Sequence, residues 1–374
     1  MTLPTFALER NQSLWENHVT HNLTESGLHP HALADVLSPE ELTEVMSLPL
    51  GYGYTDGDPE LKARIASLYP GAGAANVLVT NGSAEANFVA MWSLLQPGDE
   101  IVYMVPNYMQ IHGIAQALGV TVRPWPLRQA LGWQPDLDEL ERLISDRTRA
   151  IVICNPNNPT GAVLPPETQR AIAAIAEAHD LWVHSDEIYR GSELEGDEGP
   201  SFAGFSSRGI VVSGLSKALG FPGLRLGWIV APAALIEECW RRHDYTSIST
   251  SIISQYAAVR ILAPGTRERL LQRGREHLRR NLALVEQWVD GYQGRLTLTR
   301  PQAGGMAFIG YDAALDSQGL VDRLRSECDV FLVAGTWFGM EGYLRIGIGV
   351  THETLETGLN RIDPVLKKLL GVGP

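Results

Sequence analysis

The sequence contains few cysteines, and those it has are not clustered. Cys154, Cys239 and Cys328 stand far apart and form no C-x-x-C pair. They cannot all be paired with one another, which argues against a disulfide framework and favours a reducing compartment. We therefore expect a cytoplasmic protein, and we expect no metal ion.

Long basic runs and long apolar runs are also missing. No block of Lys and Arg interrupts the formal charge of −13, which is spread over the chain, so a nucleic acid partner is not expected. No uninterrupted apolar stretch approaches the length of a membrane span, and the first residues lack the basic-then-apolar order of a secretory signal. We expect a soluble protein with no membrane partner. We find no internal repeat and no low-complexity segment.

What the sequence does contain is the composition of a globular protein. Its 374 residues are 44% hydrophobic and 20% charged, a length that favours two domains. Short β-rich runs alternate with helical patterns in the middle of the chain, which predicts an α/β fold with a mostly parallel sheet sandwiched by helices. The predicted strands are 76–80, 100–105, 150–156, 181–189, 209–214 and 225–231, and candidate helices include 83–95, 137–145 and 166–179.

The pattern changes after about residue 262. Pro264 and Gly265 precede a long charged helical pattern at 266–290, which is followed by shorter predicted strands and a last helix from about residue 351. We expect these residues to form a smaller α+β domain, joined by the first thirty or so residues, which look irregular. The predicted division is a large domain at 35–262 and a small domain at 1–34 plus 263–374.

The most informative segment is SGLSKALGFPGLRLGW at 213–228. A lone lysine in a loop is nearly always a solvated charge. Lys217, however, follows a predicted strand and lies among small residues, and the glycines that follow it allow a flat ligand to approach closely. The segment reads S-K-x-x-x-x-x-G-x-R-x-G, with Arg225 eight residues after the lysine.

This pattern resembles the cofactor-lysine signature of class I/II aminotransferases, the fold type I pyridoxal-phosphate enzymes of the aspartate-aminotransferase superfamily. Other segments match the family in order and approximate spacing, so the resemblance covers nearly the whole chain. It implies the fold of these transferases, a pyridoxal 5′-phosphate cofactor and a homodimer. The matching segments are YTDGDPELKARIA (54–66), TNGSAEAN (80–87), NPNNPTG (155–161), DEIY (186–189) and YLRIG (343–347).

The resemblance assigns the groups that would act on the cofactor ring. Lys217 would form the Schiff base and then carry protons as the general acid and base. Asp186 would keep the pyridine nitrogen protonated; for a lone aspartate, a turn or helix cap would be the default. Tyr189 and Asn158 would hydrogen-bond the ring hydroxyl oxygen, although Asn-Pro is also a common turn former. Tyr108 would stack on the ring, with a buried core tyrosine as the alternative.

The cofactor phosphate needs backbone donors and a cation. Gly82, Ser83 and Ala84 open a predicted helix, whose free N–H groups and dipole favour an anion. Arg225 would add the charge and Ser216 a hydroxyl. Tyr52 stands where family members reach a phosphate across the dimer interface, but Tyr54 competes for that role, and Tyr52 is equally an ordinary loop aromatic.

Substrate contacts are expected from the two ends of the chain. Arg345 would grip the substrate α-carboxylate, with a solvated edge-strand arginine as the alternative, and Asn158 would also face the substrate. The segment 21–30 resembles the one that closes over substrate, which brings in Gly27 and Glu25. Glu25 is similar to a glutamate of aminocyclopropane-carboxylate synthases and would favour an amino or guanidino side chain; a solvated loop glutamate is the plainer interpretation.

The chain also departs from the family pattern. Gly214 stands where many relatives carry a serine, with Ser213 one position earlier, so one phosphate contact is in question. Before the carboxylate arginine, relatives often have Pro-Gly-Ser, whereas this chain has Ala334, Gly335 and Thr336, followed by Trp337 and Phe338. That loop is expected to border the substrate.

The leading hypothesis is an aminotransferase that moves an amino group between an L-amino acid and a 2-oxo acid. A lyase or cyclase acting at Cβ or Cγ would use the same residues, and a sensor without catalysis is a remote third possibility. No second arginine can be assigned to a dicarboxylate side chain, so an aspartate or glutamate specialist is not expected.

Overall fold

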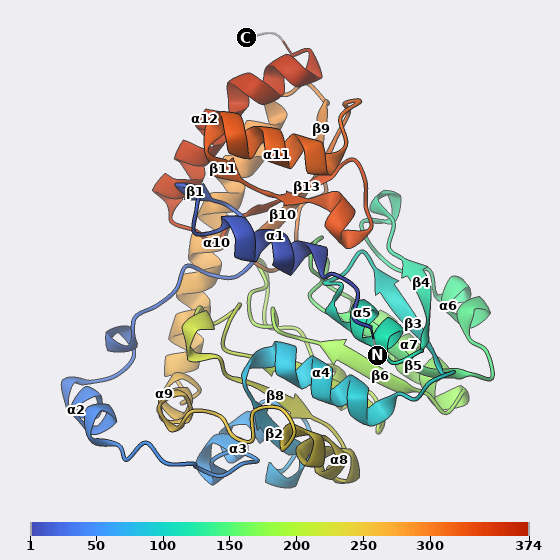
Figure 1. The fold of residues 1–374 in the computed structure, drawn as a ribbon, viewed down its shortest axis with the longest axis vertical. Coiled ribbons are helices and arrows are strands. Elements are labelled where there is room, and N and C mark those ends of the chain that lie inside the picture. The colour runs from blue at the N-terminus through green and yellow to red at the C-terminus, as the bar shows by residue number, and fades with distance from the viewer. Residues whose placement is uncertain (1, 373–374) are drawn as a thin grey trace.

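A computed structural model describes residues 2–372, and its centre is a seven-stranded sheet (Figure 1). All neighbouring strands run parallel except β8, which is antiparallel to both of its neighbours. In spatial order the strands are β2 (Val77–Thr80), β8 (Gly227–Val230), β7 (Gly209–Gly214), β6 (Trp182–Asp186), β5 (Thr148–Cys154), β3 (Glu100–Val105) and β4 (Thr121–Pro126).

Alternating side chains of these strands enter two separate cores. In β5, Ile151 and Ile153 face one core while Ala150 and Val152 face the other, because successive strand residues point to opposite sides of a sheet. Strands that are apolar on both sides need helices on both faces. One face is covered by α4 (Gly82–Leu94), α5 (Gln110–Ala117) and α8 (Ala233–His243). The other is covered by α3 (Pro59–Ala66), α6 (Leu137–Leu143), α7 (Pro166–Ala178) and α9 (Ile252–Ile261). The predicted fold class is confirmed.

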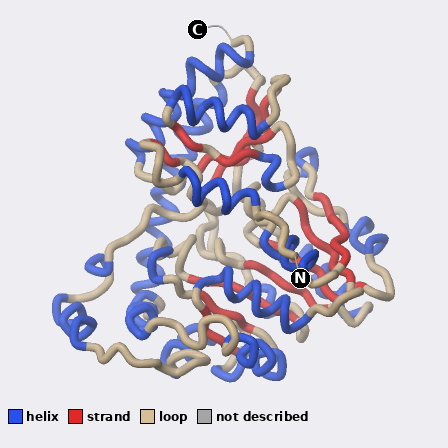
Figure 2. Tube along the Cα trace, viewed as in Figure 1, coloured by secondary structure: helices blue, strands red, loops and turns tan. Residues whose placement is uncertain are grey.

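A smaller antiparallel sheet lies apart from the large one (Figure 2). Its order is β12 (Val333–Ala334), β13 (Tyr343–Gly347), β10 (Met306–Tyr311) and β9 (Leu296–Leu298). The helices α10 (Thr266–Asp290), α11 (Ser317–Cys328) and α12 (His352–Leu370) pack with it. The boundaries of the two domains stay a prediction.

The first thirty residues are more ordered than predicted. They contain a helix, α1 (Ala7–Trp15), and a short strand, β1 (His21–Asn22), that pairs in parallel with β11 (Val330–Phe331). The expectation of an irregular segment is therefore wrong. The helix was hidden because it is short and buries one side chain fully, that of Leu8. The short helix α2 (Pro39–Ser47) leads from here toward the large sheet.

The segment 23–29, which we call the strap, links the two sheets through its backbone. Leu23 donates its N–H to Phe331 O (2.9 Å) and accepts one from Gly347 (2.7 Å). Further along, Leu28 donates to Lys217 O (3.1 Å) and His29 to Gly349 O (2.8 Å). The strap thus joins the loop of the predicted cofactor lysine to the small sheet.

Two details of the large sheet differ from prediction. Strand β4 was missed because its sequence, TVRPWP, contains two prolines, which are tolerated at a sheet edge, where β4 lies. Strand β6 ends at Asp186, so residues 187–189 are not part of it.

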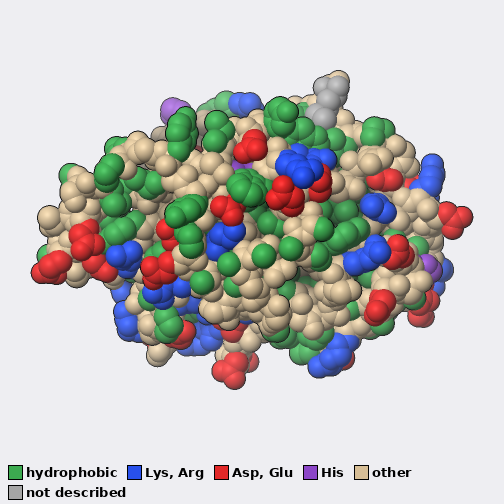
Figure 3. All heavy atoms as spheres, turned by 90° about the horizontal axis from the view of Figure 1, so that it is seen from below, with side chains coloured by type: hydrophobic (Ala, Val, Ile, Leu, Met, Phe, Trp, Pro, Cys, Tyr) green, Lys and Arg blue, Asp and Glu red, His purple; other side chains and the backbone are tan. Residues whose placement is uncertain are grey.

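None of the helices among residues 2–372 is both long and apolar enough to cross a membrane. On the face shown in Figure 3, acidic and basic side chains are interspersed.

Candidate active site

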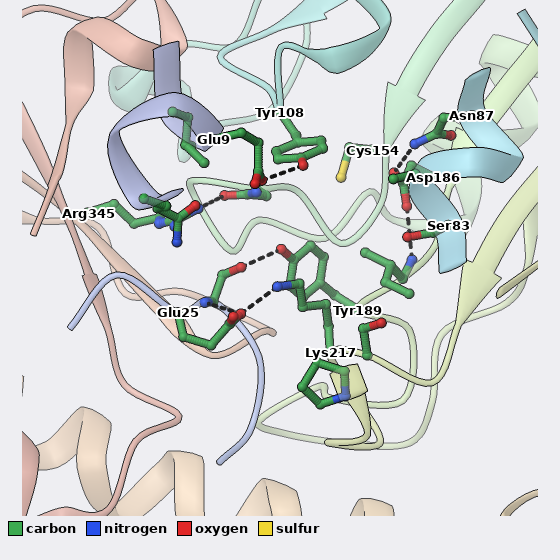
Figure 4. A pocket seen from close by; sticks show the side chains of 18 of the residues that line it. Glu9, Glu25, Ser83, Asn87, Tyr108, Cys154, Asp186, Tyr189, Lys217 and Arg345 are labelled. Carbon is green, nitrogen blue, oxygen red and sulfur yellow. Dashed lines mark hydrogen bonds and ion pairs between the residues drawn. The ribbon is translucent and has the colours of Figure 1, made fainter. Parts of the chain in front are cut away.

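A cavity of about 310 Å³ opens at the carboxyl ends of the central strands, the edge where open α/β sheets bind ligands. Strands β5 and β6 end in register here, with Cys154 opposite Asp186. The cavity also receives residues from α1, the strap and β13 (Figure 4). Its lining comprises Leu8, Glu9, Gln12, Glu16, Glu25, Ser26, Ser83, Ala84, Asn87, Tyr108, Cys154, Asn158, Asp186, Ile188, Tyr189, Ser216, Lys217, Pro222, Arg225 and Arg345.

Lys217 extends into this cavity from the loop after β7 and forms an ion pair with Glu25 of the strap (Figure 4). Burial alone would raise the pKa of Glu25, but the charge of Lys217, the backbone N–H of Gly27 and the charge of Arg345 outweigh it and lower that pKa to about 2. Gly27 lies against the lysine so closely that a Cβ there would be 3.0 Å from Lys217 Cα. The strap therefore forms the wall of the cavity that faces Lys217.

Asp186 is a carboxylate with neutral partners only. Asn87 donates its Nδ2–H to Asp186 Oδ2 (3.1 Å), and the backbone N–H of Ile188 reaches Oδ1 (3.2 Å). Burial raises the pKa of Asp186, although these hydrogen bonds and the charge of Lys217 act in the opposite direction. A cationic N–H donor beside such a buried carboxylate would stabilise its ionised form.

Tyr189 and Asn158 are held by residues of the opposite wall. The Tyr189 hydroxyl shares a hydrogen bond of 2.8 Å with Ser26 Oγ of the strap, and burial raises its pKa. Asn158 accepts a hydrogen bond on Oδ1 from Arg345 Nη1 (2.7 Å). Because its oxygen is engaged, the amide nitrogen of Asn158 is the group left to donate to a ligand.

Arg345 is 2% exposed, yet it has no carboxylate within salt-bridge distance anywhere in residues 2–372. Besides Asn158, its guanidinium donates to the backbone oxygen of Thr24 (2.6 Å), and Nε has no hydrogen-bond partner. Leaving a buried arginine without a counter-charge is costly. The cavity thus offers a place for an anionic group of a ligand.

The far end of the cavity is built for a second anion. Helix α4 begins at Gly82, and no side chain caps it, so its first N–H groups, including those of Ser83 and Ala84, are available. Arg225 lies against this end: a Cβ on Gly82 would come within 2.6 Å of Arg225 Nη2. Glycine at position 82, whose φ is +79°, is needed for both reasons.

Tyr108 lies on the side of the cavity that α1 covers. Its hydroxyl donates a hydrogen bond to Glu9 Oε1 (2.5 Å), and Figure 4 shows the two side chains next to each other. The charge of Glu9 and, above all, burial raise the pKa of Tyr108. The sequence pointed to Tyr108 but not to Glu9.

The structure brings eleven of the predicted site residues to the cavity wall and places the others outside it. Gly27 and Gly82 lie directly behind the wall, against Lys217 and Arg225. Tyr52 and Tyr54 are 82% and 61% exposed and do not line this cavity, so their role across an interface stays a prediction. The eleven are Glu25, Ser83, Ala84, Tyr108, Asn158, Asp186, Tyr189, Ser216, Lys217, Arg225 and Arg345.

The two departures from the family pattern lie outside the cavity lining. A Cβ on Gly214 would be 2.8 Å from Leu226 O, so a serine there would clash, and Ser213 instead donates to Glu187 O (3.2 Å). Trp337 points to Gln318, to which its Nε1–H donates (2.7 Å). Only Phe338 approaches the site, with its ring 5.2 Å from the Arg345 guanidinium carbon.

Several lining residues were missed in the sequence. Asn87 was within reach, because it closes the quoted segment TNGSAEAN and lies one helical turn beyond Ser83. Glu9, Gln12 and Glu16 are spaced three and four residues apart, which would place them on one helical face. The spacing indicates a shared face only if the segment is helical, and the sequence of this short helix does not predict one.

Comparison with known proteins decides the family. The model for aminotransferases of class I and II matches residues 30–362. The chain belongs to this family. Capreomycidine synthase of Streptomyces vinaceus is 34% identical over 92% of this chain and 89% of the relative. Arginine–pyruvate transaminase of Pseudomonas aeruginosa is 32% identical over 86% and 83%. A PLP-dependent aminotransferase from Streptococcus suis superposes with a TM-score of 0.93 and 30% identity, covering 99% of both chains.

The cofactor of this family member is pyridoxal phosphate, and the cavity has a group for each part of it. The uncapped start of α4 and Arg225 suit the phosphate. Asp186, which lacks a cationic partner, suits a protonated ring nitrogen, and the Lys217 amine suits the aldehyde. The residues present therefore fit the cofactor.

Proposed function

We propose that this family member is an aminotransferase that moves an amino group between an L-amino acid and a 2-oxo acid. The observation that carries this is that one cavity is lined by both the Lys217 amine and the buried guanidinium of Arg345, which has no carboxylate within salt-bridge distance among residues 2–372. One group is suited to the reacting carbon and the other to a carboxylate attached to that carbon. An α-amino acid has both features on adjacent atoms.

When bound, pyridoxal phosphate would supply an electron sink that weakens the Cα–H bond of an amino-acid substrate. Lys217 is the base that takes this proton, since it is the one amine lining the cavity. The same Lys217 amine would then deliver the proton to the carbon that carried the aldehyde of the cofactor. Asp186 would hold the ring nitrogen in its protonated form, because burial disfavours the charged carboxylate and a cationic N–H donor beside it would offset this cost.

Arg345 and Asn158 orient the substrate. The guanidinium binds the α-carboxylate with paired hydrogen bonds, which fixes the direction of the Cα–H bond relative to Lys217. Arg345 donates a hydrogen bond to Asn158 (2.7 Å). The guanidinium that binds the substrate carboxylate therefore also orients the Asn158 amide, which would contact the cofactor.

A reaction at Cβ or Cγ of the substrate is the second candidate. It is supported by the relative named a synthase, at 34% identity, beside another named a transaminase. The same Cα deprotonation precedes both outcomes, so the proposed residue roles are common to them.

The deciding experiment follows the visible absorption of the enzyme loaded with pyridoxal phosphate while single L-amino acids are added, with the products analysed by mass spectrometry. We expect the band to disappear with a suitable amino acid, a 2-oxo acid of unchanged carbon skeleton to form, and a second 2-oxo acid to restore the band. A product with an altered skeleton or released ammonia would replace the first candidate by the second.

Lys217→Ala tests the central assignment, with Lys368→Ala as the matched control because Lys368 is exposed and forms no ion pair among residues 2–372. We expect the lysine variant to lose all turnover and the control to keep it. Borohydride reduction followed by peptide mapping is a direct check, since the chain has four lysines, Lys62, Lys217, Lys367 and Lys368. Labelling at any lysine other than Lys217 would refute the assignment.

We also infer a homodimer that works in the cytoplasm. The supporting observation is an exposed apolar segment near the start of the large domain, where Met46, Leu50, Tyr52 and Tyr54 are between 61% and 86% exposed. Surface of this kind is typical of an interface. Light scattering at micromolar concentration would show twice the chain mass of 40.9 kDa; a single-chain mass would contradict the inference.

A further inference from the structure

The charges that line the cavity do not balance once the cofactor and the α-carboxylate are assigned. Lys217 serves the cofactor aldehyde, Arg225 its phosphate and Arg345 the carboxylate, and Asp186 pairs with the ring nitrogen. No lining cation is left for the remaining carboxylates. These are Glu9, Glu16 and Glu25.

Two of these carboxylates come from one helix. Glu9, Gln12 and Glu16 follow one another at spacings of three and four, so they share the face of α1 and its C-terminal cap that lines the cavity. The helix is fixed from two sides. Gln12 Nε2 donates to Thr24 Oγ1 of the strap (3.0 Å), and the ring of Trp15 lies under the guanidinium of Arg325, whose carbon is 3.8 Å from the ring centre.

Glu16 lies in the same cavity wall as Glu9 and Glu25, close enough for both charges to act on it. Partial burial raises the pKa of Glu16, and the charges of Glu25 and Glu9 raise it further, while Lys217 lowers it. Among residues 2–372, neither Glu9 nor Glu16 forms a salt bridge. The backbone N–H groups of Ser26 (2.8 Å) and Gly27 (3.0 Å) fix Glu25 Oε1 in place. A cation placed among them would be stabilised by all three.

Arg345 supplies the independent sign that a ligand belongs here. It is buried, and among residues 2–372 it has no carboxylate within salt-bridge distance and no hydrogen-bond partner for Nε, although it lies in the wall of the same cavity. A molecule that satisfies both ends must carry a carboxylate near Arg345 and a positive charge near the face of α1.

We propose that Glu9, Glu16 and Glu25 bind the positively charged end of the substrate side chain, so that the amino donor is an α-amino acid with a distal guanidinium or ammonium group. This rests on the proposed function, which places the amino and carboxylate groups of the same molecule at Lys217 and Arg345. A guanidinium fits better than an ammonium, because its planar fork can bond two carboxylates at once. Side-chain carboxylates are repelled.

The experiment compares L-arginine with L-citrulline, which has nearly the same shape but no charge. The half-saturating concentration for the change in visible absorbance of the loaded enzyme is measured for both, and for L-lysine, L-ornithine and L-glutamate. We expect L-arginine to saturate at a concentration about 10- to 100-fold lower than L-citrulline, since one charge-assisted contact changes affinity by about this factor. Equal values, or a preference for L-glutamate, would overturn the proposal. A lower value for L-lysine or L-ornithine than for L-arginine would keep the carboxylate site but assign it to an ammonium group.

Glu16→Gln is the sharpest variant, because Glu16 is exposed, ends α1 and does not touch Lys217. We expect it to remove most of the advantage of L-arginine and to leave L-citrulline unchanged, a pattern that general damage to the fold would not give. The matched control is Glu141→Gln on α6, an exposed glutamate that has no ion pair in the described part of the chain. If Glu16→Gln and the same change at Glu9 both keep the full advantage, the proposal is wrong.

Calorimetry separates failure of this inference from failure of the proposed function, because binding needs no turnover. If L-arginine binds the loaded enzyme in preference to L-citrulline but no 2-oxo acid forms, the carboxylate site stands and the proposed reaction fails. If neutral amino acids are transaminated as well as L-arginine and bind equally, the reaction stands and the carboxylate site fails.

Discussion

The two ends of the cavity are held in place by different means. At the sheet end, Asp186 closes β6 in register with Cys154 of β5, so hydrogen bonding within one sheet fixes the groups that meet the cofactor. At the α1 end, Glu9 and Glu16 reach the cavity through a helix that is docked by side chains. Strand register thus sets the position of the Asp186 carboxylate, whereas the carboxylates of α1 depend on contacts between distant segments.

The largest effect is expected at the sheet end. Asp186→Ala should lower kcat/KM by about 10³-fold, or about 4 kcal/mol, because the ring nitrogen would lose the charge that keeps it protonated. Steady-state kinetics with the best amino acid would measure this, and Asp138→Ala, a change at an exposed residue of α6, should have no effect. A loss below threefold would show that the sheet end does not carry the chemistry.

Arg345→Gln should have the next largest effect, and it sharpens the contrast between the ends. Removing the carboxylate clamp should raise the half-saturating concentration of every α-amino acid by about 10²-fold, whatever its side chain. Glu16→Gln, by contrast, should affect cationic side chains alone. If the arginine variant discriminated between side chains as the glutamate variant does, the two ends would not be separate binding sites.

The smallest effect concerns the turn that precedes α4. Glu85 Oε2 accepts the backbone N–H of Asn81 (2.6 Å), and Oε1 accepts hydrogen bonds from Thr246 (2.5 Å) and Ser247 (2.6 Å). Burial would raise the pKa of Glu85, but these hydrogen bonds and His243 lower it to about 2.

Because the folded-state pKa lies below the ordinary value, Glu85 contributes stability above about pH 4.5, and this contribution is lost as the pH falls toward 2. Glu85→Gln should cost about 1 to 2 kcal/mol at pH 7, after allowance for solvent screening, and should flatten the loss of stability in acid. Urea unfolding at pH 7, 5 and 3 would measure it beside Glu141→Gln. An unchanged acid slope would mean that Glu85 does not hold this turn.

The sequence was sufficient for the large sheet because its strands are short apolar runs bounded by turns, and for the cofactor end because its residues cluster in local motifs. Lys217, Arg225 and the glycines between them lie within nine residues. Strand β4 was missed because proline is a poor sign of a strand unless the strand is known to lie at an edge.

The α1 end could not be predicted for a different reason. Nothing in the spacing of Glu9 and Glu16 shows that their helix docks beside Tyr108, a contact formed by tertiary packing across 99 residues. Glu25 was noticed only through the family resemblance, and its ion pair with Lys217 joins residues that are 192 positions apart. Local patterns carry no information about such contacts.

Because β1 pairs with β11, its pairing must wait until the ribosome has made almost the whole chain. Thr20 donates its backbone N–H to Asp329, which is 309 residues further along the chain. At the usual pace of about 5 to 20 residues per second, a ribosome makes the second partner roughly 15 to 60 s after the first. During that interval the growing chain has Glu25 but lacks β11 and β13, which hold Leu23 of the strap, so Lys217 is made before the strap has all of its partners.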